Sequence, residues 1–108
     1  MISTVLAVML AAAAPGPADK IAVARKEYTR CLKAFMDKSV KDKTEVSTFK
    51  AALATTCADK EQAFRSAVVA ADVAAGIKRA AAEETAKTDV EDIRLNTSET
   101  YEGILNPQ

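Results

Sequence analysis

Two cysteines constrain the fold of this 108-residue chain more than any other feature. Cys31 and Cys57 lie at equal distances from Thr44. In an antiparallel helical hairpin, residues that face each other have position numbers with a constant sum. The pairs that share this sum, to within one residue, are Phe35 with Leu53, Ala24 with Phe64, and Ile21 with Ala67 and Val68. The sequence therefore predicts a helical hairpin tied by a Cys31–Cys57 disulfide.

Apolar side chains recur every three or four residues on both sides of this midpoint, as on the buried face of a helix. In the first arm they are Ile21, Ala24, Tyr28, Cys31 and Phe35. In the second arm they are Val46, Phe49, Leu53, Cys57, Phe64, Val68, Ala71 and Ala75. We expect a first helix over 19–38, a loop over 39–43, and a long second helix that continues to about residue 86. The polar step at Lys60 and Glu61 would face Tyr28 and bond its hydroxyl.

One uninterrupted helix is the alternative, because residues 38–44 contain neither Gly nor Pro. The two sulfurs would then lie roughly 39 Å apart, at a rise of about 1.5 Å per residue. A disulfide needs Cα atoms within about 7 Å, so the cysteines could then bond only between two chains. We favour the hairpin because several independent pairs agree on one register.

The first 18 residues carry no charged side chain, and residues 2–14 form an apolar run of the length typical of a signal peptide. Cleavage after Ala14 would leave Pro15 first, whereas cleavage after Ala18 leaves small residues before the cut. We therefore expect a signal peptide over 1–18 and a soluble product in the periplasm or outside the cell. Two cysteines in a small exported chain fit one disulfide bond. The alternative is that residues 2–14 are an N-terminal apolar helix.

The second helix should extend beyond the reach of the first. Its unpaired part carries an apolar stripe that recurs at four, four and three residues, and this stripe is a candidate interaction surface: Val69, Val73, Ile77 and Ala80. Two interpretations stay open. Either residues 88–105 fold back over the stripe as a third helix, or a partner covers it. A second copy of the chain is the simplest partner.

The stripe loses its phase near Glu83, and Thr88 followed by Glu91 resembles a capping box. This pattern predicts a kink at Lys87–Thr88 and a short C-terminal helix that ends at Leu95. We therefore divide the chain into a hairpin domain over 19–95 and an acidic, partly mobile tail over 96–108.

Charge is distributed unevenly along the neutral chain. Residues 19–50 hold nine basic and five acidic side chains, net +4, and residues 83–108 hold two basic and seven acidic ones, net −5. The acidic tail could cross the first helix of its own chain or of a second copy. Alternatively, both are solvated faces, because exposed ion pairs contribute only about 0–1 kcal/mol each.

The composition argues against catalysis. The chain has no His, its three glycines are isolated, and its two cysteines are 26 residues apart, so it lacks the usual general base, a phosphate loop and a C-x-x-C motif. We expect no enzyme activity, no cofactor, no metal site and no small-molecule substrate. Scarce aromatic residues and balanced charge also argue against nucleic-acid binding.

These observations predict an all-α, exported, non-enzymatic protein that acts through protein–protein contact, with a protein partner or a second copy in a homodimer. The alternative function is a membrane-surface protein that is retained by its uncleaved N-terminal apolar segment, with the basic first helix near anionic lipid. A signal peptide, one disulfide and Ala-rich helices are too general to indicate a family.

Overall fold

The computed structural model describes residues 16–107, and these form helices joined by short turns without any strand. The predicted all-α class is therefore confirmed for the described part of the chain. The predicted signal peptide lies outside the described residues, except for its last three positions. The helices are α1 (Pro17–Asp42), α2 (Val46–Leu53), α3 (Ala58–Ala74) and α4 (Arg79–Leu105).

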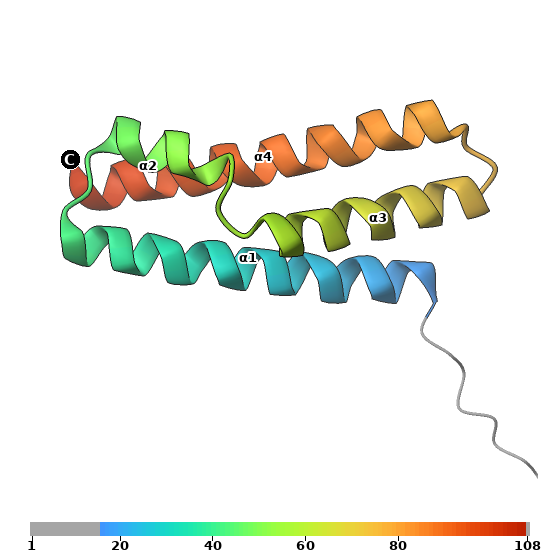
Figure 1. Ribbon diagram of the computed structural model, residues 1–108, viewed down its shortest axis with the longest axis horizontal. Helices are drawn as coiled ribbons and strands as arrows, with labels where there is room; N and C mark the ends of the chain where they lie inside the picture. The colour runs from blue at the N-terminus through green and yellow to red at the C-terminus, as the bar shows by residue number, and fades with distance from the viewer. Residues whose placement is uncertain (1–15, 108) are drawn as a thin grey trace, which may run out of the picture.

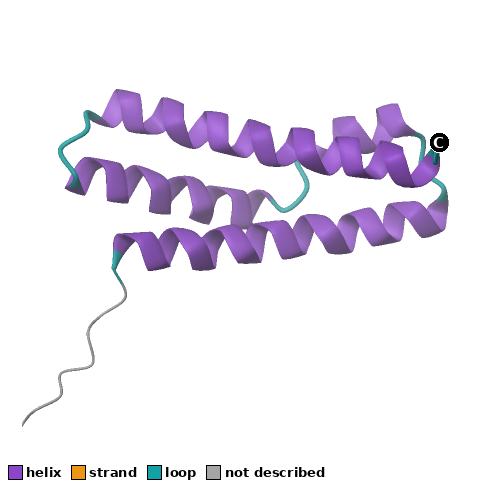
Figure 2. Cartoon of the chain, turned by 180° about the vertical axis from the view of Figure 1, so that it is seen from behind, coloured by secondary structure: helices purple, strands orange, loops and turns teal. Residues whose placement is uncertain are grey.

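The chain runs along the long axis of the molecule three times (Figure 1). The helix α1 spans most of this axis, the second arm returns as α2 and α3, and α4 runs back over both. Figure 2 shows from behind that α3 lies between α1 and α4, while α2 lies against α4 at the opposite end of the molecule. The hairpin is thus one part of a three-helix bundle, and α4 is the helix that folds back over the hairpin.

The two ends of α1 are fixed by local backbone interactions. At its start, the Gly16 N–H donates to the Asp19 carboxylate at 3.3 Å. At its end, Lys43 takes a left-handed conformation with φ 53°, and the Thr44 N–H donates to the Ser39 carbonyl at 3.0 Å. This is the usual way in which a helix ends. The predicted loop over 39–43 is wrong, because α1 continues to Asp42 and the turn covers 43–45.

The predicted disulfide is present. Cys31 and Cys57 are bonded, with their Cα atoms 6.1 Å apart. The aromatic register on either side of the bond differs from the prediction. Phe35 stacks on Phe49 with ring centroids 5.2 Å apart, and Tyr28 stacks on Phe64 at 6.3 Å. The sum of the two position numbers is thus as predicted for the cysteines, smaller for Phe35 with Phe49, and larger for Tyr28 with Phe64.

A turn over residues 54–57 explains this change of register and divides the predicted long second helix into α2 and α3. The first arm advances seven residues from Tyr28 to Phe35, whereas the second arm uses fifteen from Phe49 to Phe64. At about 1.5 Å per residue, a straight helix of fifteen residues would be about 12 Å too long to meet both rings. The turn, in which Cys57 is left-handed with φ 62°, takes up the excess.

The second break also lies elsewhere than predicted. The chain turns at 75–78, where Gly76 has φ 91°, a conformation that glycine adopts more easily than other residues. No kink occurs at Lys87–Thr88, and α4 is continuous to Leu105. Its buried face starts with small side chains, Ala82 and Ala86, and continues with Val90. The loss of phase seen in the sequence reflects the break at Gly76, twelve positions before the expected one.

The predicted end of the C-terminal helix at Leu95 is wrong, because residues 96–105 form the last turns of α4. Tyr101 is completely buried, and its ring stacks on Phe49 with centroids 3.9 Å apart. The Tyr101 hydroxyl lies within hydrogen-bond distance of the carbonyl oxygens of Thr44 and Ser39, the latter at 3.2 Å. The C-terminal helix thus covers the turn between α1 and α2.

The ion pairs of the described residues connect α4 to α2 and α3, and none of them connects α4 to α1. Lys50 of α2 lies 3.6 Å from Glu102 of α4, and Arg94 of α4 binds Glu61 of α3. Between α1 and α3, the carboxylate of Glu27 on α1 lies 3.5 Å from the ammonium group of Lys60 on α3. The acidic C-terminal helix therefore folds back without using the charge of α1.

Tyr28 gives a testable consequence of this packing. Its hydroxyl is buried and has no hydrogen-bond partner among residues 16–107, because Lys60 and Glu61 bind other side chains. Burial of an unbonded hydroxyl costs about 1–3 kcal/mol. Tyr28→Phe should therefore keep or raise the free energy of unfolding, by up to about 1 kcal/mol, in urea titration. A loss of more than about 1 kcal/mol would show that the hydroxyl is bonded.

Candidate functional site

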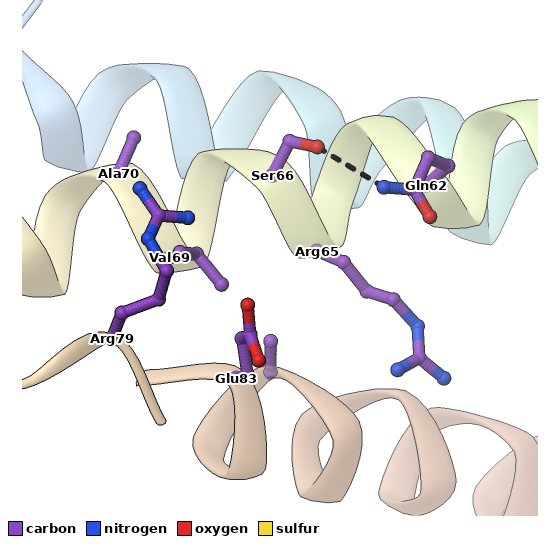
Figure 3. A pocket seen from close by; sticks show the side chains of 8 residues that line it. Gln62, Arg65, Ser66, Val69, Ala70, Arg79 and Glu83 are labelled. Carbon is purple, nitrogen blue, oxygen red and sulfur yellow. Dashed lines mark hydrogen bonds between the residues drawn. The ribbon is translucent and has the colours of Figure 1, made fainter. Parts of the chain in front are cut away.

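A hollow of about 480 Å³ lies between α3 and α4, near the end of the molecule where these helices meet (Figure 3). It forms because several facing side chains of the two antiparallel helices are small, so the helix surfaces leave space between them. The hollow is lined by Gln62, Arg65, Ser66, Val69, Ala70, Arg79, Glu83 and Ala86.

Two side chains of opposite charge come from the first turns of α4. Arg79 extends toward Val69, and the Glu83 carboxylate points from α4 toward α3 (Figure 3). Neither side chain forms an ion pair with another described residue. On the α3 side, the Gln62 amide donates to the Ser66 hydroxyl at 3.4 Å. The hollow thus combines an apolar floor with a rim that carries both signs of charge.

The structure separates the four residues of the predicted interaction surface. Val69 is half-buried and packs against the core from the wall of the hollow. Val73, in the last turn of α3, is 39% exposed, and Ile77, in the turn before α4, is 42% exposed. Ala80 is exposed in the first turn of α4. The helix α4 therefore covers the inner side of the stripe and leaves its outer side open.

Three other large apolar side chains of the described residues are exposed, and one of them, Ile104, lines a second hollow with Val40 and Val46. Val23 on α1 is 59% exposed, and Leu95 and Ile104 lie exposed on the outside of α4. Single exposed apolar residues are normal on protein surfaces. Val73 and Ile77 are four residues apart, in the last turn of α3 and in the turn that follows it. We call Val69, Val73, Ile77 and Ala80, together with the rim residues Arg79 and Glu83, the α3–α4 surface.

A partly buried charge cluster was missed by the sequence reasoning. Glu61 of α3 lies 3.4 Å from Arg65 Nε and also binds Arg94 of α4, whose guanidinium donates to the Ala54 carbonyl at 3.2 Å. These contacts join α3, α4 and the 54–57 turn. Because two guanidinium groups already bind the carboxylate, the cluster is a structural clamp. No local pattern could have revealed the contact with Arg94, since Arg94 follows Glu61 by 33 residues.

The α3–α4 surface presents apolar side chains and charged groups of both signs. Among residues 16–107, no group of three His, Cys, Asp or Glu side chains could hold a metal ion. An apolar floor with a charged rim is the typical arrangement of a protein-binding surface.

Comparison with protein-family models, with curated proteins and with solved structures found no match to this chain.

Proposed function

We propose that this chain is an exported, non-enzymatic helical protein that acts through protein–protein contact at its α3–α4 surface. One observation carries the proposal: after α4 has folded back, Val73 and Ile77 remain about 40% exposed. Large apolar side chains from all four helices already form the core. Adjacent apolar side chains that stay outside such a core are typical of a surface that a partner covers.

Export to the periplasm or to the outside of the cell is supported by two features. The N-terminal apolar segment has the length of a signal peptide. The Cys31–Cys57 disulfide is of the kind that persists in oxidising compartments. Because the disulfide joins α1 to the start of α3, it also holds in place the helix that presents Val73.

Val73→Asp should abolish partner capture, because a carboxylate would replace an apolar side chain that the partner desolvates. Val23→Asp is the matched control, since Val23 is also exposed but lies on α1, which contributes no residue to the α3–α4 surface. Both tagged variants should retain the helical content and thermal stability of the parent chain. The measurement is quantitative mass spectrometry of proteins captured from the native compartment, with an expected loss of at least tenfold for Val73→Asp alone.

Equal capture by the parent chain and both variants would contradict the proposed contact surface. Loss of capture by both variants would place the contact elsewhere or make it non-specific. Loss by Val23→Asp alone would move the interaction surface to the outer face of α1.

A membrane-surface role is the second candidate, and the arrangement of the helices favours it at one point. The turn between α3 and α4 lies at the same end of the molecule as the start of α1 (Figure 1). That end combines Ile77 with the cations Lys78 and Arg79, and cations near a membrane surface attract anionic lipid. None of the described helices is sufficiently long and apolar to cross a membrane.

The mass of the chain isolated from its native compartment distinguishes the two functions. An N-terminus at Asp19 is expected for the exported protein. An intact Met1, together with recovery in the membrane fraction, would favour the membrane-surface role instead.

A further inference from the structure

We propose that the partner at the α3–α4 surface is a second copy of this chain, related by a twofold axis, so that Arg79 of each copy faces Glu83 of the other. The inference rests on the proposed function, because it names the occupant of the same surface. Its carrying observation is a pair of opposite charges at the rim of the hollow that have no ion-pair partner among the described residues.

Twofold symmetry sets a strict condition on charge. When residue i contacts residue j of the other copy, residue j must contact residue i. Arg79 and Glu83 are four residues apart on α4, about 6 Å along the axis, and both line the hollow. If α4 of a second copy lies over the mouth of the hollow in antiparallel orientation, with the twofold axis between these positions, each Arg79 meets a Glu83. Two residues of like charge at these positions would repel each other instead.

Within one chain, the position of Arg79 is electrostatically unfavourable. Arg79 is the first residue of α4, where the helix dipole disfavours a cation. Glu83 follows it by four residues, and this order of charges, with the cation nearer the N-terminus, is the weaker arrangement for a pair within one helix. The carboxylate of a second copy would supply the compensation that the single chain lacks.

The apolar surface allows two copies to approach closely. Ala70 and Ala80 are exposed and small, and Val69 is half-buried at the wall of the hollow. Side chains from a second copy would enter this space and cover apolar atoms that α4 leaves open. Charge would then set the register of the contact, and apolar burial would supply its affinity.

The test is the mass of the purified, disulfide-bonded chain by sedimentation across a wide range of concentration. We expect a reversible monomer–dimer equilibrium. Arg79→Glu and Glu83→Arg should each raise the dissociation constant about a hundredfold, because each reversal places like charges together at two symmetric contacts and about tenfold per contact is modest for such repulsion. The double variant, Arg79→Glu with Glu83→Arg, should restore dimerisation to near the parent level.

Glu84→Arg is the matched control. Glu84 adjoins Glu83 in the sequence but lines a different side of α4, with Ala81 and Thr88. It should leave the dissociation constant unchanged, and circular dichroism should show that all four variants stay folded.

A chain that stays monomeric at every concentration would overturn the second copy as partner. If such a monomer still captured another protein in a manner sensitive to Val73→Asp, the proposed function would stand and only its homodimeric form would fail. A dimer that Arg79→Glu weakens but the double variant does not restore would also contradict the pairing, because the contact would then not depend on this exchange of charge.

Discussion

Replacing Tyr101 by Ala is expected to lower the free energy of unfolding by about 3–5 kcal/mol, the range measured when a large buried ring is truncated. Tyr101 has no exposed surface, and its ring stacks on Phe49, which in turn stacks on Phe35. The three rings come from α4, α2 and α1, so they join all helices at this end of the molecule. A domain of this size is stable by about 5–15 kcal/mol in total, and the loss should be evident in urea titration.

Two further variants separate the parts of this effect. Tyr101→Phe keeps the ring and removes only the hydroxyl that bonds the Thr44 and Ser39 carbonyls, so it should cost about 1 kcal/mol. Ile104→Ala, at an exposed position one turn away, should change stability by less than about 0.5 kcal/mol. If Tyr101→Ala were as mild as Ile104→Ala, the C-terminal helix would not belong to the folded core.

Removal of the disulfide should have the second largest effect. The bond closes a loop of 26 residues, and the chain-entropy relation gives about 3.5 kcal/mol of stabilisation for a loop of this length. Cys31→Ser together with Cys57→Ser should therefore lower the free energy of unfolding by about that amount. Reduction of the parent chain should produce the same loss, measured in urea with and without reductant.

The conformation of Cys57 offers a sharper control. Its φ of 62° costs about 1–2 kcal/mol for a residue with a Cβ atom, and glycine avoids this cost. Cys31→Ser with Cys57→Gly should therefore be more stable than the double Ser variant by about 1 kcal/mol. If the double Ser variant were as stable as the oxidised parent, the bond would not be what ties the hairpin.

The sequence predicted the parts of the fold that depend on the two cysteines and on large apolar side chains at regular spacing. The helical first arm and the Cys31–Cys57 bond followed from the shared sum and the three–four spacing, and both are present. The constant sum of position numbers does not hold for the aromatic pairs, because it assumes that both arms are straight helices. Nothing local in the sequence Ala-Thr-Thr-Cys marks a turn, since none of these residues is Gly or Pro. The 54–57 turn takes up the extra residues of the second arm, so that both aromatic stacks can form.

The C-terminal half was harder to predict because its core residues are small. Ala82 and Ala86 are completely or almost completely buried, but Ala is common on both faces of a helix and gives little periodic signal. The apolar stripe changes face between Ile77 and Ala86, and the resemblance of Thr88 and Glu91 to a capping box moved the predicted break to Lys87–Thr88. A single Gly76 among alanines was the only local marker of the true turn.

The candidate surface could be predicted only in part. Val73 and Ile77 stood out as apolar side chains beyond the reach of the first helix, and they are 39% and 42% exposed. The hollow and its rim could not be foreseen, because Arg79 and Glu83 acquire their role only once α4 is known to start at residue 79 and to lie along α3.

Site-specific photo-crosslinking in the native compartment tests most directly whether the α3–α4 surface is a contact surface. A photoreactive side chain at position 73 should give a discrete protein adduct, and the same side chain at position 23 should give none above background. An adduct with twice the mass of the chain would identify a second copy. Equal adducts from both positions, or none from position 73, would contradict the proposal that the protein acts through this surface.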